Sequence, residues 1–141
     1  MKTLGIRNNN PLNIRRGKSV WKGEVRLGTP PNGGDRGGLF CRFVSIEWGL
    51  RAAFVLLRTY STKYRANCIR DIITRWAPPS ENDTERYIRN VCQWTGLGGN
   101  ERLTEDQWPQ LVRAMARQEC GVILDEDQIQ RGFDLYRDAN N

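Results

Sequence analysis

The chain has 141 residues, which is enough for one hydrophobic core, so we expect a single domain over residues 1–141. It contains no histidine, which excludes Ser-His-Asp and Cys-His catalysis as usually built and argues against a catalytic zinc site; we expect neither a metal nor a cofactor. Its 22 Lys and Arg against 16 Asp and Glu give a net charge of +6, which favours polyanionic partners such as nucleic acid or the bacterial cell wall.

Residues 1–40 are rich in glycine, proline and asparagine, which are residues of loops and turns. Two short stretches there have strand character, residues 20–27 weakly and residues 39–44 more strongly. We therefore expect a small β-ribbon within residues 18–44.

Helical periodicity begins at Ser45, a predicted N-cap, and apolar residues recur at helical spacing to about Tyr60. A second helix is expected over residues 67–76, because a Pro-Pro pair follows it closely. A third is expected to begin at Asn82, which has capping-box spacing to Glu85.

A glycine-rich break precedes the fourth predicted helix, for which Thr104 and Gln107 form a capping box. A final helix is expected from Asp125, where Gln128 again has capping-box spacing. The pattern predicts a mainly α domain of about five helices. Its core should contain apolar residues from all of them: Leu50, Phe54, Leu57, Ile72, Ile88, Val91, Leu111, Met115 and Phe133.

The N-terminus is polar and no apolar stretch approaches about 18 residues, so we expect neither a signal peptide nor a membrane span. The cysteines lack the C-x-x-C spacing of metal and redox sites. We expect free, mostly buried thiols. They are Cys41, Cys68, Cys92 and Cys120.

One carboxylate lies where the pattern expects an apolar residue. The apolar stripe of the fourth helix, at positions 108, 111, 112, 115 and 116, continues to Glu119 in the last turn. Burial and the negative end of the helix dipole both raise the pKa of such a carboxylate. A glutamic acid that stays protonated near neutral pH is what glycosidic cleavage needs as general acid. Glu119 is therefore the first catalytic candidate; the alternative is that it reaches solvent or pairs with an arginine.

Two other carboxylates are weaker catalytic candidates. Glu24 lies in the predicted ribbon, where a second carboxylate or a substrate contact can sit. Glu47 lies in the first turn of a helix, where an acidic residue also suits the helix dipole. Glu81, Asp83 and Glu85 surround a helix start and are interpreted as capping groups.

Three segments carry a resemblance to a known family: Asn-Asn-Pro-Leu-Asn-Ile-Arg at 9–15, Trp-Lys-Gly at 21–23, and Phe-Val-Ser-Ile-Glu-Trp-Gly-Leu-Arg-Ala at 43–52. Together they resemble phage and prophage virion-associated proteins of the lysozyme superfamily, and they are similar to the middle of bacterial glucosaminidases. Residues 76–88 resemble the segment whose aromatics line the sugar groove in glucosaminidases and lytic transglycosylases. The matches cover about residues 5–95.

The chain departs from that family at the catalytic residue. In glucosaminidases the catalytic Glu lies on a helix before the Asn-Asn block, whereas here seven residues precede the run of asparagines at 8–10 and none of them is acidic. Residues 114–121 have the expected form instead, an apolar-faced helix ending in Glu-x-Gly. The resemblance therefore implies a lysozyme-like helical domain that is circularly permuted, with Glu119 as the acid; without a permutation, the chain is an inactive relative.

The candidate substrate-binding residues are aromatic residues that would stack on sugars and asparagines that would bind acetamido groups: Asn9, Asn10, Asn13, Trp21, Trp76 and Tyr87. We expect Trp76 and Tyr87 to border a cleft that residues 9–13 also line. The asparagines have an alternative role in satisfying loop backbone. Trp48 and Trp108 are expected to be core residues.

The expected function is cleavage of peptidoglycan glycan strands by a muramidase, glucosaminidase or lytic transglycosylase mechanism. One alternative is a non-catalytic virion structural or cell-wall-binding protein. Another, less favoured because no recognised motif supports it, is a nucleic-acid-binding module built on the basic cluster of residues 15–22. The expected partners are peptidoglycan and phage virion components, and the expected location is the virion or the host cytoplasm or periplasm.

Overall fold

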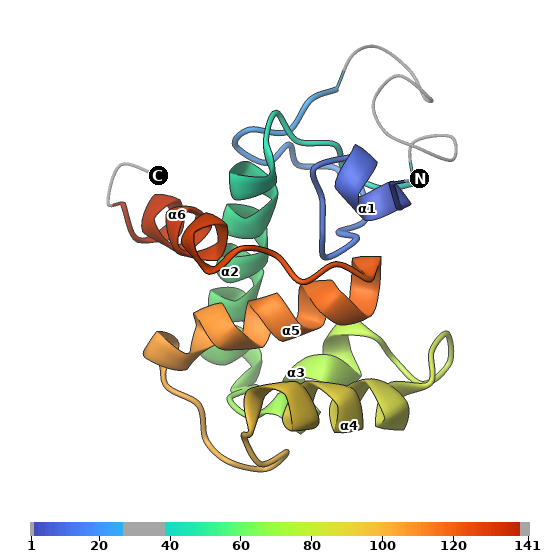
Figure 1. Cartoon of the computed structure of the whole chain (residues 1–141), viewed down its shortest axis with the longest axis vertical. Coiled ribbons are helices and arrows are strands. Elements are labelled where there is room, and N and C mark those ends of the chain that lie inside the picture. Colours follow the sequence, from blue (N-terminus) through green and yellow to red (C-terminus); the bar gives the residue numbers. More distant parts are fainter. Residues whose placement is uncertain (1, 27–38, 139–141) are drawn as a thin grey trace.

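The computed structural model describes residues 2–26 and 39–138 (Figure 1). The prediction of a mainly α fold is confirmed. In chain order, the helices of the described residues are α1 (Leu4–Arg7), α2 (Ile46–Tyr64), α3 (Ile69–Trp76), α4 (Thr84–Thr95), the 3-10 helix η1 (Glu105–Gln107), α5 (Trp108–Cys120) and α6 (Glu126–Arg137).

The predicted β-ribbon is not confirmed. Within the described residues, two isolated antiparallel bridges, Arg15 to Phe40 and Glu24 to Phe43, take the place of continuous strands. A left-handed backbone conformation at Gly23 (φ 80°) interrupts the extended conformation that a strand needs. Residues 27–38, which include part of the predicted ribbon, lie outside the described residues.

The start of one helix differs from the capping box predicted for it. The N-cap of α4 is Asp83, whose carboxylate accepts a hydrogen bond from the Arg86 N–H at 3.2 Å. Asn82 instead donates to the Pro78 carbonyl oxygen, which ties down the turn before the helix. At α6 the predicted start at Asp125 is confirmed, because Asp125 is the N-cap and its carboxylate accepts from the Asp127 N–H at 2.7 Å. The capping box at Thr104 is formed, but it opens η1, and α5 follows directly.

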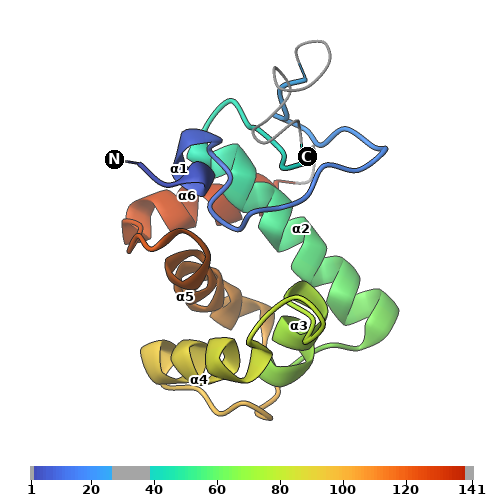
Figure 2. The same cartoon turned by 90° about the vertical axis from the view of Figure 1, so that its right-hand side faces the viewer.

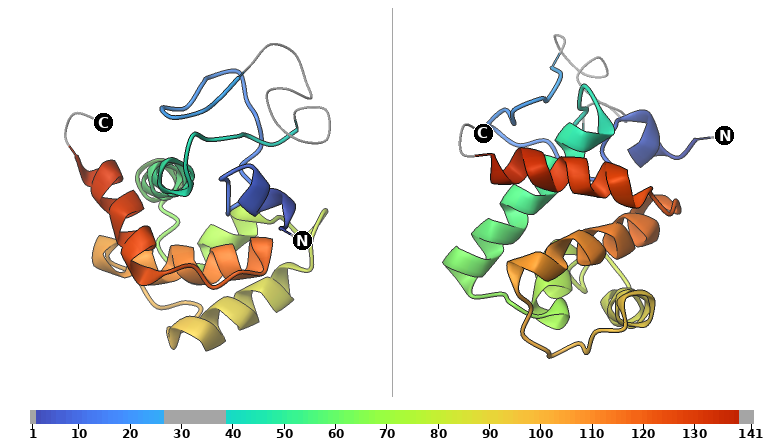
Figure 3. Two further views of the ribbon diagram at one scale, coloured as in Figure 1. Left: turned by 45° about the horizontal axis from the view of Figure 1, so that its top comes forward. Right: turned by 60° about the vertical axis from the view of Figure 1, so that its left-hand side comes forward.

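The nine predicted core residues are all buried. They come together because α5 packs against α4, α6, α2 and α1, while α6 also lies against α2 (Figures 2 and 3). Gly132 allows this last pair to approach closely, since a Cβ atom there would lie 2.6 Å from the Cβ of Leu50. Trp108 is buried as expected, and Trp48 is packed half-buried against the core.

The N-terminal segment, residues 4–16, covers one end of this helical core. Leu12 and Ile14 are buried, and α1 packs against α5. A Cβ atom on Gly5 would meet the Cys120 side chain at 3.2 Å, so the first residues of the chain lie directly beside the C-terminal end of α5. This packing places α1 beside the last turn of α5.

The cysteines are free thiols, as predicted: Cys41 and Cys120 are buried, and Cys68 and Cys92 are half-buried. Over residues 2–26 and 39–138, no group of three or more Cys, Asp or Glu is placed to hold a metal ion. Of the helices in the described part of the chain, none combines the length and apolar character needed to cross a membrane.

Candidate functional site

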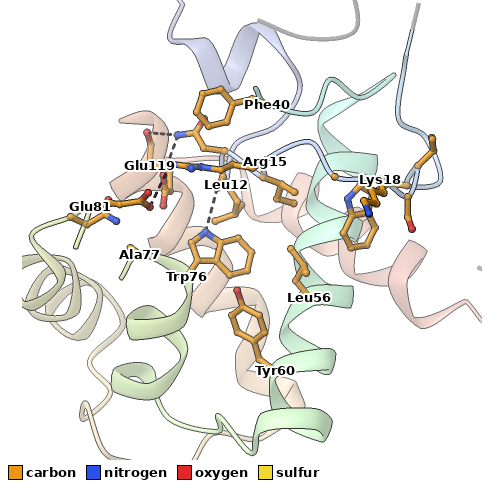
Figure 4. Close-up of a pocket in the computed structure, with 17 residues that line it drawn as sticks. Leu12, Arg15, Lys18, Phe40, Leu56, Tyr60, Trp76, Ala77, Glu81 and Glu119 are labelled. Carbon is orange, nitrogen blue, oxygen red and sulfur yellow. Dashed lines mark hydrogen bonds and ion pairs between the residues drawn. The ribbon is translucent and has the colours of Figure 1, made fainter. Parts of the chain in front are cut away.

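A cavity of about 700 Å³ lies between the N-terminal segment, α2, the end of α3 and the last turn of α5 (Figure 4). Its volume is within the usual range of small-molecule sites. Its wall combines apolar and aromatic side chains with a few charged ones. The wall residues used below are Leu12, Asn13, Arg15, Lys18, Trp21, Leu56, Tyr60, Trp76, Glu81 and Glu119.

Glu119 reaches this cavity from the last turn of α5, just before the left-handed C-cap at Gly121. Its side chain is half-buried and both of its oxygens accept hydrogen bonds. Asn13 Nδ2 donates to Oε1 at 3.1 Å, and the Tyr87 hydroxyl donates to Oε2 at 3.0 Å. Burial raises the pKa of Glu119 above its ordinary value, and the two hydrogen bonds offset part of that effect.

Tyr87 lies behind Glu119 rather than on the wall of the cavity. It is 4% exposed, so its ring has no free face on which a sugar can stack. Burial, and then the neighbouring Glu119 charge, raise the pKa of Tyr87 well above its ordinary value, which keeps the hydroxyl protonated as a donor. The structure thus places Tyr87 differently from the sequence expectation: it holds Glu119 instead of bordering the cleft.

Asn13 lines the cavity and is fixed by the backbone around it. It has a left-handed conformation, φ 54°, which asparagine tolerates better than most residues. Its Nδ2 donates to the backbone oxygen of Glu119 at 3.3 Å as well as to the carboxylate, so its amide nitrogen is taken up by Glu119.

Asn9 and Asn10 do not line the cavity. Asn10 is fully buried: its Nδ2 donates to the carbonyl oxygens of Ile14 and Cys41, both at 3.0 Å, and its Oδ1 accepts from the Ile14 N–H. Asn9 Nδ2 donates to the Phe43 carbonyl oxygen at 2.9 Å. Both side chains join the N-terminal segment to residues 41–43. They have the alternative role expected for the asparagines, in which they satisfy the hydrogen-bonding groups of loop backbone.

Trp21 and Trp76 both line the cavity, together with two residues of α2 that the sequence did not single out, Leu56 and Tyr60. The Trp76 indole is held by a hydrogen bond from Nε1 to the Leu12 carbonyl oxygen at 3.4 Å and by edge contact with Tyr60 at 5.8 Å between ring centroids. In the sequence, the only signal for Tyr60 was its i+4 spacing from Leu56. The aromatic side chains give the cavity an apolar part of its wall beside its charged groups.

The other two catalytic candidates are not brought to Glu119. Glu24 has a fully buried side chain whose oxygens accept from the Trp21 N–H at 2.9 Å and from Arg26 Nε at 2.7 Å. Glu47 forms an ion pair with Arg131 at 3.2 Å, on α2 facing α6, outside this cavity.

The second carboxylate on the cavity wall is Glu81, which the sequence assigned to helix capping. It forms an ion pair with Arg15 at 3.6 Å, across the opening between the N-terminal segment and the α3–α4 connection (Figure 4). Both side chains are more than half exposed, so this pair contributes little to stability. The ion pair places one positive and one negative charge on the same side of the cavity as Glu119.

No family model matches the chain. Protein P5 of Pseudoalteromonas phage PM2 is 40% identical to it over 134 residues, an alignment that covers 92% of this chain and 79% of that protein.

Proposed function

The chain belongs to the family of protein P5 of Pseudoalteromonas phage PM2, and we propose that it is a phage-associated protein that binds bacterial peptidoglycan and cleaves its glycan strands with Glu119 as general acid. The relative supports the phage association. The cleavage rests on one observation, the half-buried Glu119 with a raised pKa on the wall of a large, partly aromatic cavity.

In this mechanism the protonated Glu119 donates its proton to the glycosidic oxygen as the bond to the anomeric carbon breaks. Asn13 and Tyr87 hold one carboxyl oxygen each, and each oxygen keeps a second lone pair that can carry the proton. Water in a hydrolase, or a hydroxyl of the same sugar in a transglycosylase, then attacks the positively charged anomeric carbon, and the proton that it loses returns to the Glu119 carboxylate.

The cavity wall suits a sugar chain. Trp21, Tyr60 and Trp76 offer aromatic surface to the apolar faces of sugar rings, and the neighbouring polar groups can bind hydroxyls. A circularly permuted lysozyme-like domain is part of the proposal. The direct packing of Gly5 against Cys120 supports it, because a permutation needs the N-terminal segment to lie beside the end of the Glu119 helix.

The test is digestion of purified peptidoglycan sacculi, with mass spectrometry of the released fragments. Hydrolysis gives reducing ends and transglycosylation gives anhydro-muramic ends. Glu119→Gln should lower the rate by about 10²–10⁴-fold, the usual contribution of a general acid, with an unchanged fold. Release of fragments at the full rate by Glu119→Gln would assign the chemistry to another residue.

The second candidate function is a non-catalytic virion structural or wall-binding protein. The similarity to a phage protein favours this function, because the similarity indicates phage association and no catalytic activity is needed to explain it. In this case the protein would co-sediment with sacculi, Glu119→Gln would bind equally well, and neither would release fragments.

A further inference from the structure

The cavity has a second polar end, formed by residues 17–21, which we call the Lys18 loop. The loop follows the N-terminal segment, and all five of its residues line the cavity. In Figure 4, Lys18 lies on the other side of the cavity from Glu119 and Glu81. The two ends therefore differ in charge: carboxylates are at one end and an ammonium group is at the other.

The Lys18 loop is held in place by a brace behind it. Arg26 Nη2 donates to the carbonyl oxygens of Gly17 at 2.7 Å and Ser19 at 3.2 Å. Arg26 is itself fixed by the buried carboxylate of Glu24, which also accepts from the Trp21 N–H. The position of the loop on the cavity thus depends on the ion pair between Arg26 and the buried Glu24 carboxylate.

Several donors of the loop are left without a partner. Within residues 2–26 and 39–138, the Lys18 ammonium has no ion-pair or hydrogen-bond partner, and the backbone N–H groups of residues 17–20 donate no hydrogen bond. Arg15, the other cation on the cavity wall, is already paired with Glu81. Lys18 therefore supplies the uncompensated positive charge of the cavity.

We propose that the Lys18 loop is a subsite for a carboxylate carried by the glycan substrate, so that the cavity prefers acidic peptidoglycan strands to neutral chitin-type strands. A neutral N-acetylglucosamine chain gains nothing from Lys18, whereas a carboxylate gains a charge-assisted hydrogen bond. Two parts of peptidoglycan carry that chemistry: the lactyl group of muramic acid without its peptide, and the acidic residues of the stem peptide. The inference depends on the proposed glycan binding at this cavity.

The experiment titrates full-length protein carrying Glu119→Gln, which prevents turnover, with three probes followed by calorimetry. The first probe is a neutral N-acetylglucosamine tetrasaccharide. The second is a peptide-free tetrasaccharide in which N-acetylglucosamine alternates with N-acetylmuramic acid, and the third is the same tetrasaccharide with stem peptides. Adding Lys18→Gln should weaken binding of the acidic probes about threefold to tenfold and leave the neutral probe unchanged. The loss of affinity caused by Lys18→Gln should shrink at high salt, and Lys18→Arg should keep most of the affinity for the acidic probes.

Lys2→Gln is the matched control, because Lys2 is exposed and does not line the cavity. The peptide-free probe separates the two sources: a Lys18 effect on it assigns the lactyl carboxylate, and an effect on the peptide-bearing probe alone assigns the stem peptide. Equal losses for the neutral and acidic probes, or a loss in Lys2→Gln as large as in Lys18→Gln, would overturn the subsite while glycan binding stands. Binding of none of the probes would overturn the proposed function as well, and binding of duplex DNA through Lys18 in their place would assign the loop to nucleic acid.

Discussion

The hydroxyl of Tyr87 on α4 donates a hydrogen bond of 3.0 Å to Oε2 of Glu119 on α5. It comes from the buried side of the carboxyl group, so a ligand in the cavity does not have to displace it. This contact favours the ionised carboxylate and therefore lowers the Glu119 pKa, against the larger effect of burial.

Replacing Tyr87 by Phe should move the pH dependence of cleavage. Loss of the hydrogen bond raises the Glu119 pKa further, and a general acid loses activity as pH rises through its pKa. The alkaline limb of the activity profile on sacculi should therefore shift to higher pH, with a loss of stability of about 1 kcal/mol. Tyr136→Phe removes a similar Tyr–Glu contact, to Glu105 at 3.0 Å, and should leave the profile in place. A shift to lower pH in Tyr87→Phe would contradict the assignment.

Glu119→Gln should stabilise the folded protein at neutral pH by about 0.5–2 kcal/mol. Because burial raises the pKa, the ionised group destabilises the folded state once pH exceeds that pKa. Below the ordinary value of 4.5, the group is protonated in both the folded and the unfolded state. The advantage of Gln, measured by urea unfolding, should therefore be present at pH 7 and vanish on acidification below about 4.5.

The matched control for that measurement is Glu47→Gln, which removes a partly exposed ion pair with Arg131 and should change stability by less than about 1 kcal/mol. If Glu119→Gln were destabilising at neutral pH, the carboxylate would be contributing more through its hydrogen bonds than it costs through burial.

Trp76→Ala should weaken binding of N-acetylglucosamine oligosaccharides by about 1–3 kcal/mol, a scale taken by analogy from base–aromatic stacking. Trp76→Phe should recover part of the loss, because a smaller ring still offers an aromatic face. Calorimetric titration measures both. Trp94→Ala is the control: Trp94 is half-buried and contacts Arg117 away from the cavity, so unchanged affinity is expected. Equal effects of the two alanine variants would point to general destabilisation.

Glu24→Gln should lower the stability of the fold without removing catalysis. The change leaves Arg26 without its buried counter-charge and weakens the attachment of the Lys18 loop, at a cost of about 1–3 kcal/mol. Folded protein at low temperature should keep most of its turnover on sacculi. Loss of turnover with unchanged unfolding behaviour would instead return Glu24 to the catalytic candidates.

The sequence predicted best what depends on local periodicity. Apolar residues recur every three or four positions along the helix that carries Glu119. This repeat indicated both the helix and the place of Glu119 on its apolar stripe. The role of Asn10 was ambiguous because its partners are not local. An asparagine shows its hydrogen-bonding capacity in the sequence but not its partners, which here include the distant carbonyl group of Cys41. The placement of Tyr60 and Lys18 on one cavity depends on how α2 meets the N-terminal segment, which no local pattern encodes.

The hydrogen bond between Asn13 and Glu119 joins residues that are 106 positions apart. During synthesis, Asn13 leaves the ribosome long before Glu119 is made, and the hydrogen bonds of Asn9 and Asn10 to residues 41–43 can form in the meantime. The acid and its two supports come together only when α5 has emerged and packed against α1. A nascent or truncated chain that lacks α5 lacks both Glu119 and the helix against which α1 packs, so the complete site is a late product of biosynthesis.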